Sequence, residues 1–308
     1  MRTAVIGATG FVGRALVPVL AQRGEVVAVS RRGGAPDLPG VRGLAADVTD
    51  SLHGALEGVD VAYHLVHSLG SRDFAGLDRR AAANVVAEAE RAGVSQIVYL
   101  GGLGEEQQQL SHHLRSRMET AAVLASGAVP VTTLRAAVIV GRGSAAFETI
   151  VALVDRLPVM VAPRWLSTPT QPIALEDMIG YLDGVAARTE ALGESFDVGG
   201  PEVLTYGEMV KRIARIRGRR PVLLEVPVLT PRLSSYWLHL VTPVRAGVAR
   251  PLIEGLRNPT VAHDDRIRRL LPFPPTPFCD AARSALDAGR GQDLPASPRA
   301  RLRPRRAR

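Results

Sequence analysis

The stretch Gly7-Ala8-Thr9-Gly10-Phe11-Val12-Gly13 decides the fold, because it joins an apolar run, residues 3–6, to a segment with helical spacing, residues 11–23. A strand, a glycine turn and a helix follow one another there. Such a turn needs glycine where the backbone takes a positive φ or approaches a pyrophosphate, and the helix that follows offers free N–H groups and the positive end of its dipole. The pattern predicts a dinucleotide site. We expect it to be formed by Gly7, Thr9, Gly10, Phe11, Val12 and Gly13.

The next segment indicates which dinucleotide binds. Residues 25–29 are predicted to form the second strand, and Ser30-Arg31-Arg32 follow at its end. An acidic residue at this place would hold the ribose 2′-hydroxyl of NAD, whereas guanidinium groups grip a 2′-phosphate. The sequence therefore favours NADP(H) over NAD(H). The alternative is a solvated arginine pair in an arginine-rich chain.

A third segment, Asp47-Val48, follows the strand predicted for residues 41–46. A short acid at this place could accept a hydrogen bond from the adenine amino group. Asp47 could equally begin a helix predicted for residues 52–56, since aspartate is a favoured N-cap. Both interpretations stay open.

Strand-like and helical segments alternate along the first half of the chain. Apolar runs at 41–46, 59–65, 96–100 and 131–140 are separated by helical stretches at 73–91 and 110–126. This alternation predicts an α/β fold, a Rossmann-type doubly wound parallel sheet. Ligands of such sheets lie beyond the carboxyl ends of the strands.

That edge of the sheet should include the residues that follow the fourth and fifth strands. His64 and His67 come after the fourth strand, and Gly101-Gly102 after the fifth. We expect His67 to touch nicotinamide or substrate; the alternative is that it stabilises its own turn. No spacing of histidines and carboxylates resembles a metal site.

The length of 308 residues suits a nucleotide-binding domain and a smaller lobe. We assign residues 1–143 to the NAD(P)-binding domain and 144–288 to a lobe that closes over the cofactor, with strands returning to the sheet. Within the lobe, Thr205 and Glu208 are spaced as a capping box at the start of a predicted helix. Residues 289–308 form a basic tail rich in Pro, Ala and Arg, which we expect to be disordered.

The net charge of +8 comes mostly from that tail, because its last 18 residues hold six arginines and one aspartate. The other residues carry only +3, with acids and arginines interspersed, so we predict no specific nucleic-acid binding. The oligomeric state and the partners are not indicated.

The single cysteine, Cys279, excludes an internal disulfide and fits a reducing cytoplasm. The first predicted strand begins at once, which leaves no room for a signal peptide, and no apolar run reaches the roughly 20 residues of a membrane span. We therefore predict a cytoplasmic protein. Residues 233–256 are apolar but are interrupted by Pro243 and Pro251, which favours a lobe-packing or dimer helix over a membrane-surface one.

Further segments match a known family in the right order: residues 134–141 as a sixth strand, 171–178 as a lobe-joining segment, and 196–201. Together with the glycine turn and Asp47-Val48, they resemble the atypical or extended short-chain dehydrogenases/reductases, most of all the NmrA-like NAD(P)H-binding proteins, over residues 1–280. The resemblance implies the fold and a nicotinamide cofactor. It says little about substrate, because one scaffold carries many functions.

The chain departs from this family at the catalytic pair. Active members use a tyrosine with a lysine four residues later, whereas the only lysine here is Lys211 and no tyrosine has a lysine at that spacing. His113 stands at the tyrosine place and Arg117 at the lysine place. The serine expected after the fifth strand is replaced by Gly101 and Gly102.

Two functions fit this departure. In the first, Arg117 binds the cofactor ribose and His113, with an ordinary pKa of about 6.5, supplies acid/base catalysis for an oxidoreductase of a small carbonyl or quinone-like substrate. In the second, proton transfer is lost and the protein is a non-catalytic NADP(H)-sensing regulator or scaffold. A structural interpretation makes His112 and His113 helix-end residues without a role.

Overall fold

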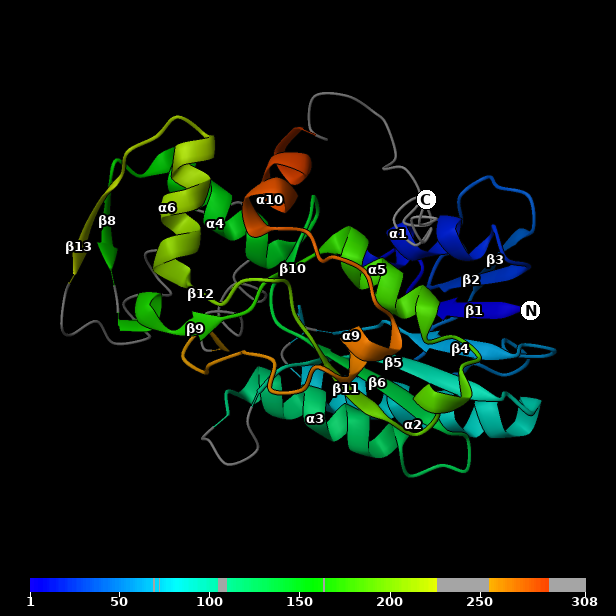
Figure 1. The fold of residues 1–308 in the computed structure, drawn as a ribbon. Coiled ribbons are helices and arrows are strands. Elements are labelled where there is room, and N and C mark those ends of the chain that lie inside the picture. The colour runs from blue at the N-terminus through cyan, green and yellow to red at the C-terminus, as the bar shows by residue number, and fades with distance from the viewer. Residues whose placement is uncertain (69, 72, 105–109, 163, 226–254, 288–308) are drawn as a thin grey trace.

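A seven-stranded parallel sheet forms the centre of the molecule (Figure 1). The computed structural model describes residues 1–68, 70, 71, 73–104, 110–162, 164–225 and 255–287. The strand order is β11-β6-β5-β4-β1-β2-β3, which confirms the predicted Rossmann-type doubly wound sheet. The strands are β1 (Thr3–Ile6), β2 (Val26–Ser30), β3 (Val41–Ala45), β4 (Val61–His64), β5 (Gln96–Gly102), β6 (Val131–Ala136) and β11 (Ser195–Val198).

Helices cover both faces of this sheet (Figure 1). Helices α2 (Phe74–Ala92) and α3 (His112–Leu124) lie on one face, and α1 (Phe11–Leu20) and α5 (Leu175–Gly184) lie on the other. Every residue of β1, β2 and β4 is buried as a result. Burial on both faces explains why these strands are continuous apolar runs rather than alternating ones.

The chain adds strands on one side of β1 as far as β3 and then continues on the other side from β4, so that β1 lies between β2 and β4. In this register Ile6 is level with Val29 of β2 and with His64 of β4. The segments that follow these three strands therefore meet at one crevice, which is where ligands of doubly wound sheets bind.

A second group of elements follows β6. Helices α4 (Ala145–Arg156), α6 (Tyr206–Ile216) and α10 (Phe278–Asp287) share one apolar cluster, and we call them, with the pair β8 (Val159–Ala162) and β13 (Val222–Glu225), the outer lobe (Figure 1). The predicted capping box is confirmed at the start of α6, where Thr205 and Glu208 exchange side-chain and backbone hydrogen bonds. The remaining short elements are β7 (Ile139–Val140), β9 (Pro169–Thr170), β10 (Ile173–Ala174), β12 (Leu204–Thr205), α9 (Arg266–Leu270) and the 3₁₀ turns Arg164–Ser167 and Thr189–Ala191.

Two predicted elements are wrong. Residues 131–140 do not form one strand: β6 ends at Ala136, and β7 pairs with β10 outside the main sheet, because the chain turns there toward the outer lobe. Residues 52–56 form turns and no helix. The positive φ angle of Gly54 explains this second difference, since it interrupts a right-handed helix.

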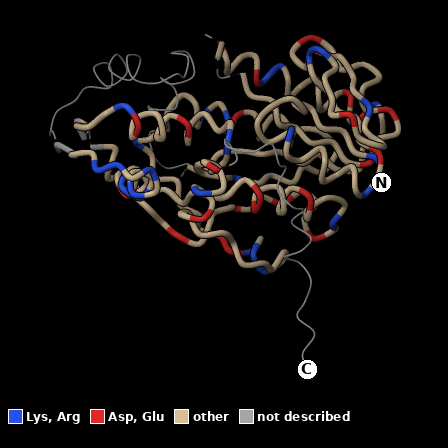
Figure 2. Tube along the Cα trace, turned by 90° about the horizontal axis from the view of Figure 1, so that it is seen from above, with Lys and Arg blue, Asp and Glu red and all other residues tan. Residues whose placement is uncertain are grey.

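Acidic and basic residues are interspersed along the described chain (Figure 2). Among the described helices, none combines the length and the hydrophobicity that a membrane span needs. The tail 289–308 and most of the apolar segment 233–256 lie outside the described residues, so the predictions made for them remain predictions.

Candidate functional site

A cleft of about 1130 Å³ opens beyond the carboxyl ends of the central strands. It begins at the glycine turn, passes the ends of β4 and β5 and reaches the outer lobe. Of the fourteen residues predicted for the site, only Arg32 does not line this cleft. The thirteen that do are Gly7, Thr9, Gly10, Phe11, Val12, Gly13, Ser30, Arg31, Asp47, Val48, His67, His113 and Arg117.

The three glycines of the turn have three different roles. Gly7 has φ +98°, a conformation that L side chains rarely adopt. A Cβ on Gly13 would stand only 2.3 Å from the Gly7 carbonyl oxygen, so Gly13 allows α1 to pack directly on the turn. Gly10 has φ −73° and an added Cβ would lie 3.1 Å from the same oxygen, so this position requires space rather than a special φ.

Helix α1 begins at this turn with free N–H groups. Gly10 is the N-cap, and among the described residues no side chain accepts a hydrogen bond there. The first-turn amides and the positive end of the helix dipole are therefore available to an anion. A glycine-rich turn before an uncapped helix fits the pyrophosphate of a dinucleotide.

Among the described residues that line the cleft beside β2 and β3, one is a cation and one is an anion. Arg31 lines the cleft, whereas its neighbour Arg32 does not. The Asp47 carboxylate accepts hydrogen bonds from the Thr49 amide at 2.9 Å and hydroxyl at 2.7 Å, and these bonds lower the pKa of Asp47. Asp47 thus stabilises its own turn while it lines the cleft, and it caps no helix.

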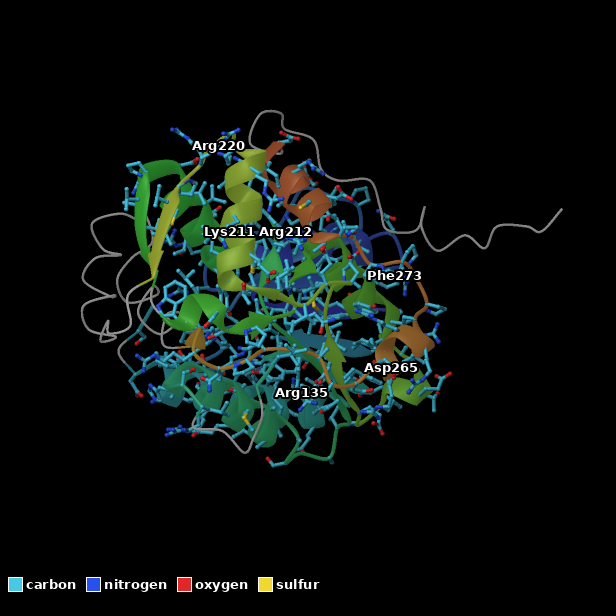
Figure 3. The ribbon with its side chains drawn as sticks, turned by 60° about the vertical axis from the view of Figure 1, so that its left-hand side comes forward. Arg135, Lys211, Arg212, Arg220, Asp265 and Phe273 are labelled. Atoms are coloured by element: carbon cyan, nitrogen blue, oxygen red, sulfur yellow. The ribbon has the colours of Figure 1, made fainter. Side chains whose placement is uncertain are left out.

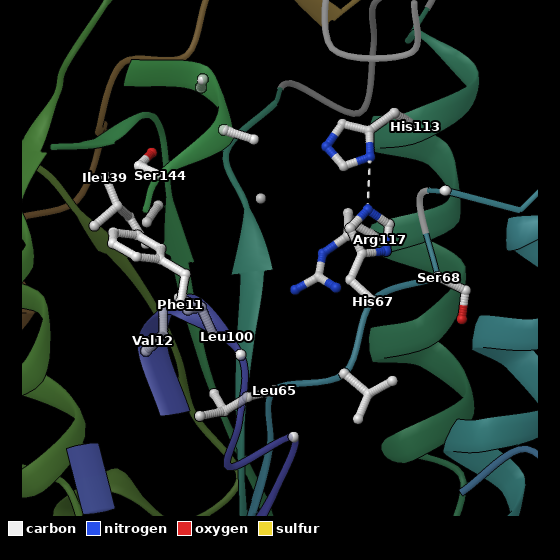
Figure 4. A pocket seen from close by; sticks show the side chains of 18 of the residues that line it. Phe11, Val12, Leu65, His67, Ser68, Leu100, His113, Arg117, Ile139 and Ser144 are labelled. Atoms are coloured by element: carbon white, nitrogen blue, oxygen red, sulfur yellow. Dashed lines mark hydrogen bonds between the residues drawn. The ribbon is translucent and has the colours of Figure 1, made fainter. Parts of the chain in front are cut away.

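A chain of hydrogen bonds forms the opposite end, beside α3 (Figure 4). Nδ1 of His113 lies 3.1 Å from Nε2 of His67, and Nδ1 of His67 lies 2.6 Å from a carboxylate oxygen of Asp78. The other carboxylate oxygen accepts the Ser68 amide at 2.8 Å. Figure 4 shows the second ring nitrogen of His113 facing the open cleft.

These histidines do not have ordinary pKa values. Burial, with the nearby His67 and Arg117, lowers the pKa of His113 to about 3, and burial also lowers the pKa of His67. This corrects the expectation of an unperturbed imidazole, since desolvation disfavours its charged form. His113 is therefore neutral at pH 7.

Arg117 lies one helical turn after His113 and also faces the cleft (Figure 4). Its guanidinium carbon is 4.8 Å from the centroid of the Tyr99 ring, and the Tyr99 hydroxyl donates to the Arg117 carbonyl at 3.1 Å. Gly102 leaves room for this helix, because a Cβ there would lie 3.2 Å from a methyl group of Leu114. The only lysine, Lys211, lies on α6 and does not line the cleft (Figure 3).

Sequence reasoning missed Asp78, although a signal was present. Phe74, Ala75, Ala81, Ala82 and Val85 form the buried face of α2, and Asp78 falls within this stripe by helical spacing. A carboxylate in an apolar stripe predicts a buried polar partner. The position of that partner, His67, could not be inferred because it follows a different element.

The outer-lobe end of the cleft carries no charged side chain among the described residues that line it. Trp165 lines the cleft beside Tyr206, with 6.2 Å between ring centroids. In the described parts of the chain, no three His, Cys, Asp or Glu side chains cluster as metal ligands would. The other large side chains of this wall are Ile150, Leu153, Val210 and Leu256.

Known proteins are similar to this chain in sequence and in fold. Residues 7–144 match the family described as NAD(P)H-binding. The chain is 27% identical over 271 residues to a chloroplastic divinyl chlorophyllide a 8-vinyl-reductase of Oryza sativa, covering 79% of this chain and 65% of that protein, just under two thirds. It is 28% identical over 277 residues to a ceramide reductase of Caulobacter vibrioides, covering 84% of this chain and 86% of that one.

Solved structures agree on the fold. MoeE5 in complex with UDP-glucuronic acid and NAD matches with a TM-score of 0.73 and 18% identity, over 94% of this chain and 99% of that one. A nucleoside-diphosphate-sugar epimerase from Staphylococcus aureus matches with a TM-score of 0.71 and 14% identity, over 92% and 100%. These structures show a Rossmann-type fold, and the part of the chain that matches the NAD(P)H-binding family, residues 7–144, contains the glycine turn.

Proposed function

We propose that this protein is an NADP(H)-dependent oxidoreductase that acts on a small, uncharged carbonyl or quinone-like compound or on the corresponding alcohol. The observation that supports the proposal is the continuity of the cleft: the glycine turn, His113 and an uncharged wall line one space. A bound nicotinamide cofactor would supply or accept the hydride. The reductase names of two relatives support the same class of reaction.

Different residues along the cleft would bind different parts of the cofactor and the substrate. The amides at the start of α1 would hold the pyrophosphate, Arg31 the 2′-phosphate of the adenosine ribose, and Arg117 the hydroxyls of the nicotinamide ribose. His113 would exchange a proton with the substrate oxygen. The order of these groups in the cleft matches the order of the parts of a dinucleotide.

The preference for NADP(H) rests on the end of β2. No acid follows this strand within Ser30-Arg31-Arg32, and Arg31 lines the cleft. A guanidinium at this position favours a 2′-phosphate, whereas a carboxylate would be needed for the free 2′-hydroxyl.

The class of substrate rests on the outer-lobe wall. A phosphorylated or otherwise anionic substrate would require a cation there to offset its desolvation. The described wall offers aromatic and aliphatic side chains instead, such as Trp165, Tyr206 and Ile150. We therefore expect a substrate without charge.

The experiment is a titration with NADPH, NADP⁺, NADH and NAD⁺, followed by a spectrophotometric screen of matched carbonyl, quinone and alcohol pairs. Tight binding of NADPH with turnover of an uncharged compound supports the proposal. NADPH binding without turnover of any pair, together with a cofactor-dependent change in affinity for a partner protein, would contradict it and support the regulatory function instead.

A further inference from the structure

We infer that Asp78 and His67 are positioning residues that hold His113 in its Nδ1–H tautomer, so that Nε2 of His113 accepts the hydroxyl proton of an alcohol bound in the cleft. This inference rests on the proposed function. It gives roles to Asp78 and His67 that the family resemblance does not supply, and it assigns the tautomer of His113.

Asp78 fixes which nitrogen donates and which accepts in each hydrogen bond of the row Asp78–His67–His113. Burial raises the pKa of Asp78, but the hydrogen bonds from His67 and from the Ser68 amide outweigh it and hold that pKa below its ordinary value. Asp78 is therefore an ionised carboxylate that can only accept. The amide of Ser68 donates to one of its oxygens, so Nδ1 of His67 must donate to the other.

The tautomers of both histidines follow from this start. A neutral imidazole has one donor and one acceptor nitrogen. Since Nδ1 of His67 donates, its Nε2 must accept, and its partner at 3.1 Å, Nδ1 of His113, must donate. The remaining nitrogen, Nε2 of His113, then carries a lone pair, and it faces the open cleft (Figure 4).

The surroundings keep this arrangement neutral until a substrate proton arrives. Among the described residues, the charged and titratable groups around His113 are Asp78 on α2, His67 after β4, and Arg117 and His112 on α3; His64, at the end of β4, lies beyond His67. Burial lowers the pKa of both rings, and the positive charge of Arg117 lowers them further. Asp78 acts in the opposite direction and would stabilise an imidazolium when one forms.

The chemical step balances without any further group. In the oxidative direction the substrate O–H bond breaks, its proton bonds to Nε2 of His113, and the hydride leaves the carbinol carbon for the cofactor, so that a C=O bond results. His113 becomes an imidazolium, and its Nδ1 proton can pass along the 3.1 Å contact to His67, beside the Asp78 carboxylate. In reduction the same proton returns to the oxygen.

The substitution Asp78→Asn should exchange the donor and acceptor nitrogens of both histidines, and it therefore tests the inference directly. In this variant the Ser68 amide would still donate to the side-chain oxygen of residue 78. The NH₂ group would then face Nδ1 of His67, and because this group can only donate, Nδ1 would have to accept. His67 would then donate from Nε2, Nδ1 of His113 would accept, and Nε2 of His113 would carry a hydrogen. Asp73→Asn is the matched control, because Asp73 lies on the same helix as an exposed N-cap, a role that asparagine also fills.

The measurement is long-range ¹H–¹⁵N NMR of the ring nitrogens in histidine-labelled protein without cofactor, combined with turnover. We expect an unprotonated Nε2 on His113 in the wild type and in Asp73→Asn, a protonated one in Asp78→Asn, and a loss of at least about 100-fold in alcohol oxidation in Asp78→Asn. The NADP⁺ affinities of the wild type, Asp73→Asn and Asp78→Asn should agree within about threefold.

Two other outcomes have separate meanings. A protonated Nε2 on wild-type His113, or the same tautomer in wild type and Asp78→Asn, overturns the inference even if the enzyme is active. The expected tautomers in a protein that binds NADP(H) but oxidises no alcohol and reduces no carbonyl overturn the proposed function and, with it, the proton transfer inferred here.

Discussion

The two ends of the cleft are built in different ways. The glycine-turn end comes from one stretch of seven consecutive residues, and its main chain owes its shape to the space that Gly7, Gly10 and Gly13 leave open. The His113 end is made of side chains brought together from distant positions: His67 is 11 residues from Asp78 and 46 from His113. A site made of backbone depends on few residue types. A site made of converging side chains can be rebuilt with different groups, and our proposal gives His113 and Arg117 the roles that the Tyr–Lys pair has in the family that the sequence resembles.

The largest expected effect is at the glycine-turn end. Gly10→Val should weaken NADPH binding by more than 100-fold, because the side chain would occupy the place of the pyrophosphate while the core is untouched. Fluorescence titration measures the affinity and circular dichroism the fold. Gly180→Ala is the control, since a Cβ there meets only Phe273, at 3.6 Å, an ordinary contact. Normal cofactor binding by Gly10→Val would show that the phosphates lie elsewhere.

The second effect tests the side-chain end. His113→Ala should reduce turnover by a factor of about 100 to 10,000, the usual contribution of a general acid or base, with little change in NADPH affinity. His112→Ala is the matched control, because the neighbouring His112 is exposed and does not line the cleft. Equal turnover in the two variants would make His113 a helix-end residue without a catalytic role.

The third effect separates the two arginines after β2. We expect Arg31→Ala to reduce the preference for NADPH over NADH by about tenfold, or about 1.4 kcal/mol, since a cleft-lining guanidinium is lost. Arg32→Ala should change it by less than threefold. The measurement is the ratio of the NADH and NADPH dissociation constants for each variant. An unchanged ratio in Arg31→Ala would remove the argument for NADP(H).

The smallest effect concerns stability beneath the His113 end. His64 is fully buried against the Tyr99 ring, neither of its ring nitrogens has a hydrogen-bond partner among the described residues, and burial lowers its pKa to about 3. The unfolded chain, in which His64 titrates at about 6.5, binds this proton more readily. The free energy of unfolding therefore falls as the pH drops from about 6.5 toward 3.

His64→Leu should remove this loss. We expect the free energy of unfolding to rise by about 1 kcal/mol at pH 7.5, since an unsatisfied polar ring is replaced, and by about 1 kcal/mol more at pH 5.5. Urea denaturation at the two pH values measures both, with the exposed His53→Leu as control. A gain that does not grow as the pH falls would falsify the assignment of a neutral buried His64.

Local patterns in the sequence determined the regular framework of this protein. The strand, glycine turn and helix of residues 3–20, the apolar runs of the main strands and the Thr205–Glu208 capping box each depend on neighbours within a few residues. Backbone conformation and one-sided burial are encoded at that range, so periodicity and turn residues suffice to predict them. The glycines of the turn also indicated one end of the cleft, because the shape of that end depends on the backbone.

Only the tertiary structure decided the other features. The break between β6 and β7 depends on a partner strand, β10, more than thirty residues away. The exclusion of Arg32 from the cleft, the contact of Asp78 with His67 and the lowered pKa of His113 depend on how α2, α3 and the strand ends pack. Desolvation and hydrogen-bond direction are set by groups that are near in space and distant in sequence, and no local pattern contains them.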